Sequence, residues 1–95
     1  MKLISIEPLT GSKYKYLAVF KKPDGTYKKT HFGASGYTDF ILSGDTKKRD
    51  AYRARHAKDL DTGDFTRAGY LSWWILWNKP SLAASIADYK KRFNV

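Results

Sequence analysis

The amino-acid sequence predicts a single α+β domain, with an N-terminal three-stranded antiparallel sheet followed by three helices packed on it. Three observations lead to this prediction. The chain has 95 residues, which is the usual size of one domain. Aromatic and β-branched residues alternate in its first third, whereas apolar residues recur at helical spacing in its last third. No linker, repeat or low-complexity stretch divides it. We therefore expect residues 1–95 to form one domain.

Three runs in the first third have the composition of strands. Leu3–Glu7 is a short β-rich run that ends at Pro8, and Lys13–Lys21 is rich in aromatic and β-branched residues. The sequence PDG at residues 23–25 predicts a turn, because proline fixes φ and glycine supplies a positive φ. Thr26–Phe32 then returns as the second arm of a hairpin. Together these runs predict an antiparallel meander.

A connector and a strongly basic helix follow the predicted sheet. Gly33–Ser43 contains two glycines and is expected to lack regular structure. Asp45 is expected to cap a helix over Thr46–Lys58, which holds six cations and only one acidic residue, Asp50. Like charges three and four residues apart repel each other. Their retention indicates an anionic partner for this helix.

Two further helices are expected to supply the core. The first begins at a cap on Asp64 or Thr66 and ends near Asn78. The second begins after Pro80, and its apolar residues recur at helical spacing up to Phe93. Helical spacing favours burial over base stacking for the aromatic residues of the first of these helices. Those aromatic residues are Tyr70, Trp73, Trp74 and Trp77.

Charge and composition restrict the class of protein. The net charge is +9, and residues 1–58 hold 13 basic and five acidic residues, so the positive charge is concentrated there. Such an asymmetry indicates a polyanionic partner, with nucleic acid first and an acidic protein second. The chain has no cysteine, which favours a reducing, intracellular setting. The longest apolar run, Trp73–Trp77, is too short to span a membrane, and the N-terminus is too polar for a signal peptide.

The expected nucleic-acid contacts come from the basic helix and the hairpin. The helix is expected to contact phosphates, with its lysines and arginines as the main groups. The hairpin interleaves lysines with tyrosines, a pattern that suits single strands but is equally typical of a solvated sheet face. The residues expected to contact nucleic acid are Lys13, Lys15, Lys28, Lys29, Lys47, Lys48, Arg49, Arg53, Arg55 and Lys58.

No catalytic residue, metal ligand or cofactor site is predicted. His31 with Asp39, or His56 with Asp59, would form a base and its orienting carboxylate. A metal-dependent nuclease needs several clustered carboxylates, and the acidic residues are scattered in the sequence. No phosphate-binding loop or nucleophile elbow occurs. We therefore expect a protein that is not an enzyme.

Four segments give the chain a resemblance to a known family. They are HFGASGYTD at residues 31–39, YRARH at residues 52–56, ILWNKP at residues 75–80 and SIADYKKRF at residues 85–93. In these segments the chain resembles a family of small, basic, uncharacterised proteins encoded by large nucleocytoplasmic double-stranded DNA viruses. The resemblance implies expression in an infected host cell, with the nucleus or the virion as the place of action. It brings no catalytic residues with it.

These observations lead to one expected function and one rival. The expected function is non-enzymatic binding of nucleic acid, DNA rather than RNA, in double-stranded form and through phosphates, as in viral genome packaging. The rival is a structural or protein-interaction component of a virion or infected cell with an acidic protein partner. Convergence of hairpin and helix cations on one face would favour nucleic acid, and a flat exposed apolar patch would favour a protein.

Overall fold

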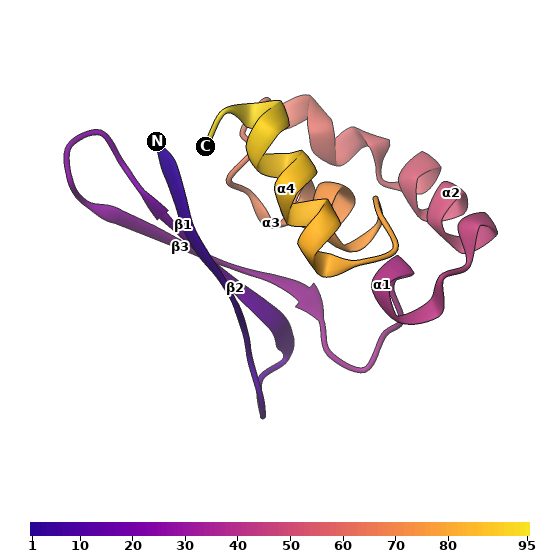
Figure 1. Ribbon diagram of the computed structural model, residues 1–95. Coiled ribbons are helices and arrows are strands. Elements are labelled where there is room, and N and C mark those ends of the chain that lie inside the picture. Colours follow the sequence, from indigo (N-terminus) through magenta and orange to yellow (C-terminus); the bar gives the residue numbers. More distant parts are fainter.

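Three antiparallel strands in the order β1-β2-β3 form the sheet of this protein, in a computed structural model that describes residues 1–95. They are β1 (Lys2–Pro8), β2 (Tyr14–Lys21) and β3 (Tyr27–Ala34). All helices lie on one side of this sheet, so its other face carries no helix (Figure 1). The predicted α+β fold, with an N-terminal antiparallel sheet followed by helices, is confirmed.

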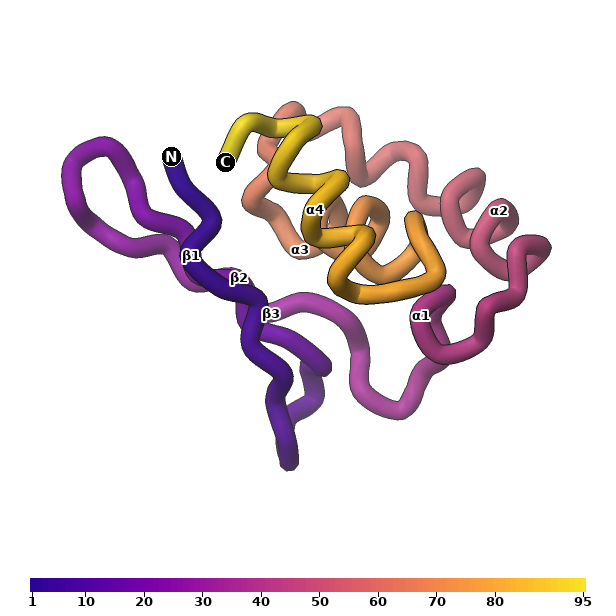
Figure 2. Tube along the Cα trace, in the orientation of Figure 1, coloured from indigo at the N-terminus to yellow at the C-terminus, as the bar shows by residue number.

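The helical layer contains more elements than the sequence predicts. The tube in Figure 2 shows the chain leaving β3 and turning into a short helix before the basic helix begins. No helix of the structure is both long enough and apolar enough to cross a membrane. In chain order the elements are α1 (Phe40–Ser43), α2 (Thr46–Arg55), the 3-10 helix η1 (Ala57–Thr62), α3 (Ala68–Leu71), the π-helical turn η2 (Ser72–Leu76) and α4 (Leu82–Phe93).

The expected connector is wrong in one respect, because it contains α1. Asp39 caps this helix by accepting a hydrogen bond from the Leu42 amide at 2.8 Å. Gly44 ends the helix in the left-handed conformation, and its amide bonds to the Phe40 carbonyl. The basic helix begins at its predicted cap, Asp45, but it ends at Arg55 and continues as η1.

The aromatic helix begins later than expected and is wider in its second half. Neither Asp64 nor Thr66 caps it, since the residue before α3 is Arg67, which makes no side-chain capping bond. The Asp64 carboxylate is held instead by Thr66 in a local turn, with Oδ1–Oγ1 at 2.6 Å. At the far end the Trp77 amide bonds to the Ser72 carbonyl, five residues back, which defines the π turn. The extra residue rotates the later side chains around the axis. Leu71 before this turn and Ile75 within it are both fully buried.

The core lies between the sheet and the helices and is rich in aromatic side chains. Phe20 and Phe32 of the sheet are fully buried, as is Tyr89 of α4. The Tyr89 hydroxyl donates a hydrogen bond to the Phe65 carbonyl at 2.5 Å, and burial raises the pKa of Tyr89. Phe65 also stacks on Phe93 with ring centroids 5.2 Å apart. Of the three tryptophans only Trp77 is buried, and the other two are half-buried against the core surface.

At Gly33 the sheet approaches the helical layer closely. Its φ is +77°, and a Cβ built on it would lie 2.8 Å from Leu76 Cδ1 and 3.3 Å from Lys15 Cβ. Only glycine satisfies both conditions, since a side chain here would be strained and would clash. Lys15, beside Gly33, turns toward the helices, where its Nζ contacts Asp39.

Replacing Gly33 by alanine is expected to lower the free energy of unfolding by at least about 2 kcal/mol, from the positive φ and the contact with Leu76 together. The control is Gly36→Ala, since Gly36 also has a positive φ, +84°, but has nothing within 4 Å of its missing Cβ. This control is expected to lose only about 1 kcal/mol. Urea unfolding of both variants measures the difference, and equal losses would contradict the packing argument.

Candidate functional site

Two of the arginines expected to contact phosphates, Arg49 and Arg53, point into the protein. The Arg53 guanidinium lies 3.7 Å from the centre of the Trp73 ring and 5.2 Å from that of Trp74. Its Nε and Nη2 are buried and have no hydrogen-bond partner. Burial lowers the pKa of Arg53, and the nearby charges of Arg49 and Arg92 lower it further. The charge of Arg53 is thus held against the aromatic helix.

Arg49 also faces inward on α2. Its Nε pairs with Asp50 at 3.0 Å, and its Cζ lies 4.9 Å from the centre of the Phe40 ring. Nη1 donates to the Asn78 carbonyl at 3.5 Å. Arg49 therefore connects α2 to α1 and to the segment after η2.

Two hairpin lysines likewise contact other groups of the protein. Lys15 Nζ lies 2.7 Å from the buried Asp39 Oδ2, and the two side chains are only 16% and 2% exposed. Lys28 Nζ donates to Thr66 Oγ1 at 2.7 Å and lies 3.7 Å from Asp64 Oδ2. Both lysines therefore join the sheet to the helical layer.

The other six predicted contact residues are exposed, but not on one face. Lys29 pairs with Val19 in the sheet and lies on the face without helices, and Lys13 lies in the loop before β2. The remaining four follow α2 and the start of η1: Lys47, Lys48, Arg55 and Lys58. None of these four takes part in an ion pair of the structure, which leaves their charges free.

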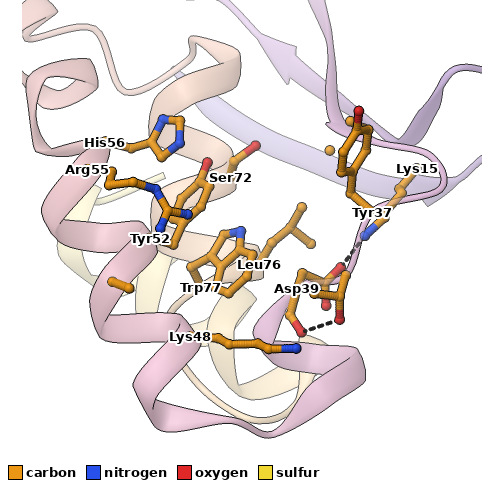
Figure 3. A pocket seen from close by; sticks show the side chains of 14 residues that line it. Lys15, Tyr37, Asp39, Lys48, Tyr52, Arg55, His56, Ser72, Leu76 and Trp77 are labelled. Atoms are coloured by element: carbon orange, nitrogen blue, oxygen red, sulfur yellow. Dashed lines mark hydrogen bonds and ion pairs between the residues drawn. The ribbon is translucent and has the colours of Figure 1, made fainter.

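A cleft of about 630 Å³ lies between the sheet and α2. The end of β3, the connector, α2 and η2 all contribute to its walls (Figure 3). Lys15 and Asp39 lie on the side of the sheet, and Lys48 and Arg55 lie on the side of α2. The cleft is thus the place where a hairpin lysine and helix cations converge, with two cations in excess when His56 is neutral.

Aromatic rings form the α2 wall of the cleft. The Tyr52 ring lies between those of His56 and Trp77, with centroid distances of 4.1 and 4.4 Å and interplanar angles of 22° and 8°. Burial raises the pKa of Tyr52, and the charge of Asp59 adds to this effect. Across the cleft stands Tyr37, which is 73% exposed (Figure 3). The cleft therefore has one packed aromatic wall and one free aromatic ring.

The two histidines lie in different surroundings. His56 Nδ1 is 3.2 Å from Asp59 Oδ2, so the two side chains form the pair that the sequence suggests. His31 lies beside Tyr14, with ring centroids 5.6 Å apart, while the carboxylate considered as its partner binds Lys15 instead. Nowhere in the chain do three or more His, Asp or Glu side chains gather closely enough to hold a metal ion.

Sequence reasoning missed the aromatic lining of the cleft. Tyr52 and His56 are four residues apart, which places them on one side of a helix and was a signal for their stacking. Nothing in the sequence indicates that Trp77 completes the stack, because this contact joins residues 25 positions apart and depends on the π turn. Tyr37 follows Gly36 in a loop, where spacing gives no orientation.

Sheet, helical layer and cationic cleft define a small basic α+β protein. Residues 4–56, which are more than half of the chain, match a family described as a family of unknown function, DUF5754, and the chain belongs to this family. No curated protein and no solved structure shows a significant match. The matched residues run from β1 to the end of α2 and include the cations of the cleft.

Arg53→Ala is expected to lower the free energy of unfolding by about 2 kcal/mol or more, because it removes a desolvated cation–π contact and the packing of the side-chain stem on Trp73. The matched control is Arg55→Ala, on the exposed side of the same helix, which is expected to change stability by less than about 0.5 kcal/mol. Thermal and urea unfolding measure both. An Arg53 variant as stable as the control would show that the contact contributes nothing.

In the native protein, hydrogen bonds from the Thr66 hydroxyl and amide lower the pKa of Asp64. Thr66→Val removes the hydroxyl, so it is expected to raise the pKa of Asp64 toward its ordinary value of 3.8. A depressed carboxyl pKa stabilises the fold above the unfolded-state pKa, and this contribution is lost as the pH falls through the folded-state pKa. The stability gap between the two proteins should therefore shrink on acidification.

Carboxyl NMR titration and urea unfolding from pH 7 to pH 2 measure both effects. Asp24 is the internal control, because Thr26 holds it in the same way and its pKa is also lowered. Its titration should be the same in wild type and variant. An unchanged Asp64 titration would contradict the assignment of the shift to Thr66.

Proposed function

We propose that this protein binds nucleic acid without catalysis, mainly through phosphates, and that α2 is the main contact surface. The observation that carries the proposal is the sorting of charge around this helix. At 3.6 residues per turn, Lys47, Lys48 and Arg55 fall within an arc of roughly 100°. All three are exposed and free of ion pairs, whereas the inward arginines are engaged in the fold.

The exposed cations suit a phosphate backbone better than base edges. Phosphate contacts need flexible, unpaired cations in a row, and each contact releases counterions from the nucleic acid. Lys58 extends the row beyond Arg55 at the start of η1. We expect duplex DNA as the partner, and the resemblance to viral proteins extends the proposal to neutralising genome charge during packaging in an infected cell.

The rival is an acidic protein partner, and one observation favours it. The sheet face without helices carries the half-buried Leu17 and Val19 beside the exposed Lys29, which gives a partly apolar surface. A protein partner would cover this face, whereas nucleic acid would bind along α2. The two proposals therefore differ in the surface that binding protects.

The first test is fluorescence anisotropy of labelled blunt-ended duplex DNA over a salt series. Four phosphate contacts predict a log–log slope of affinity against salt of about −4. Replacing Lys47, Lys48, Arg55 and Lys58 together by alanine is expected to weaken binding and to flatten this slope. The reason is that each lost contact removes about one unit of slope.

The control variant carries the same change of charge elsewhere. Lys21, Lys22, Lys90 and Lys91 are exposed, lie outside α2 and make no ion pair. Their joint replacement by alanine is expected to leave most of the affinity in place. Equal losses in both variants would show that only net charge matters, and no binding by the wild type near physiological salt would refute the proposed function.

A further inference from the structure

We propose that the cleft beside α2 binds a single nucleoside monophosphate unit, with its base against Tyr37 and its phosphate between Lys48 and Arg55. The unit is either a free mononucleotide or an unpaired nucleotide of a strand. Only the second case rests on the proposed function.

The size and position of the cleft fit a ligand of this kind. Its volume of about 630 Å³ lies within the range typical of small-molecule sites. Its walls come from parts of the chain that are distant in sequence, from β2 to η2. The Lys15–Asp39 ion pair fixes one wall and the stacked rings of α2 fix the other, so the space between them is formed in advance.

The aromatic side chains indicate a planar ligand. Both faces of the Tyr52 ring are covered, by His56 and Trp77, so this wall is rigid. Tyr37 is 73% exposed and has no stacking partner within the protein, which leaves a ring face free. A base in the cleft would lie between this ring and the opposite wall, which Tyr52 helps to line (Figure 3).

The charges indicate an anionic group on the same ligand. Lys48 and Arg55 lie two helical turns apart on the rim, and neither is neutralised by a carboxylate. Asp39, the acidic residue of the lining, is neutralised by Lys15 at 2.7 Å and does not repel an anion. An arginine on the rim offers a bidentate contact to a phosphate. Base and phosphate together are the chemistry of a nucleotide.

The exposed cations of α2 connect the cleft with the proposed phosphate row. Lys48 and Arg55 line the cleft, and Lys47 and Lys58 lie outside it on the same helix and its continuation. A strand whose terminal base enters the cleft therefore keeps its neighbouring phosphates beside α2.

Titration of the full-length protein with adenosine 5′-monophosphate, followed by NMR, tests the inference. The indole N–H signal of Trp77, which lines the cleft, is expected to shift. The signal of Trp73 is expected to stay, because the Trp73 Nε1 donates to the Arg53 carbonyl outside the cleft. Inorganic phosphate and adenosine are expected to bind at least about tenfold more weakly than the nucleotide. No shift at millimolar nucleotide, or equal binding of phosphate alone, would overturn the assignment.

Variants then assign the two halves of the ligand. Tyr37→Ala is expected to weaken nucleotide binding on the order of tenfold, whereas Tyr37→Phe keeps the ring and the affinity. Arg55→Ala should remove most of the difference between nucleotide and nucleoside. Lys91→Ala, an equal charge change on α4, should leave binding unchanged. A Tyr37→Ala protein with wild-type affinity would overturn the stacking contact.

Duplexes with and without one unpaired terminal nucleotide distinguish the two sources. A preference for the overhang that Tyr37→Ala abolishes, with blunt-duplex affinity unchanged, supports a strand nucleotide as the occupant. Mononucleotide binding without an overhang preference supports the free nucleotide. If neither appears while blunt duplex binds, this inference fails and the proposed function stands. If mononucleotide binds but no duplex does, the proposed function fails and the cleft assignment stands.

Discussion

The structure depends on a buried carboxylate that a lysine from the sheet neutralises. Asp39 is 2% exposed, and a charged group so deeply buried is tolerated only with an oppositely charged partner and further hydrogen bonds. Lys15 supplies the charge and the Leu42 amide supplies a hydrogen bond, so one side chain joins β2 to the first turn of α1. Gly33 lies beside this pair, and its missing side chain leaves room for Leu76 and Lys15. Lys15, Gly33 and Asp39 all line the cleft.

Cations in this protein have two distinct roles, which helical periodicity separates. The inward cations of α2 are arginines, whose guanidinium groups lie over the rings of Phe40 and Trp73. The outward cations of α2 are Lys47, Lys48 and Arg55, and none of them takes part in an ion pair. A run of charge that looks uniform in the sequence is therefore divided into a structural half and an exposed half. The repulsion expected within α2 is reduced because aromatic rings and Asp50 offset the inner charges.

The sheet and the approximate order of helices could be predicted because they depend on local signals. Alternation, the turn at residues 23–25 and the cap at Asp45 act over a few residues and are readable in the sequence. The π turn, the inward direction of Lys15 and the cleft depend on contacts between distant segments. Among the predicted site residues, only the exposure of each side chain in the folded protein distinguishes the free cations from those that contact other groups. Arg53 and Arg55 are an example, because they are two residues apart on α2, yet the guanidinium of Arg53 lies over Trp73 whereas Arg55 is exposed.

The engaged cations of α2 are both arginines, whereas three of the four free cations along α2 and the start of η1 are lysines, and this difference has a chemical consequence. Acetylation converts a lysine ammonium into a neutral amide and does not act on guanidinium groups. Acetylating Lys47, Lys48 and Lys58 would remove three of the four free charges along α2 and the start of η1, and it would leave the arginine–aromatic contacts of the fold in place. Acetylation of these lysines would therefore change the charge of the exposed surface without removing a contact that stabilises the fold.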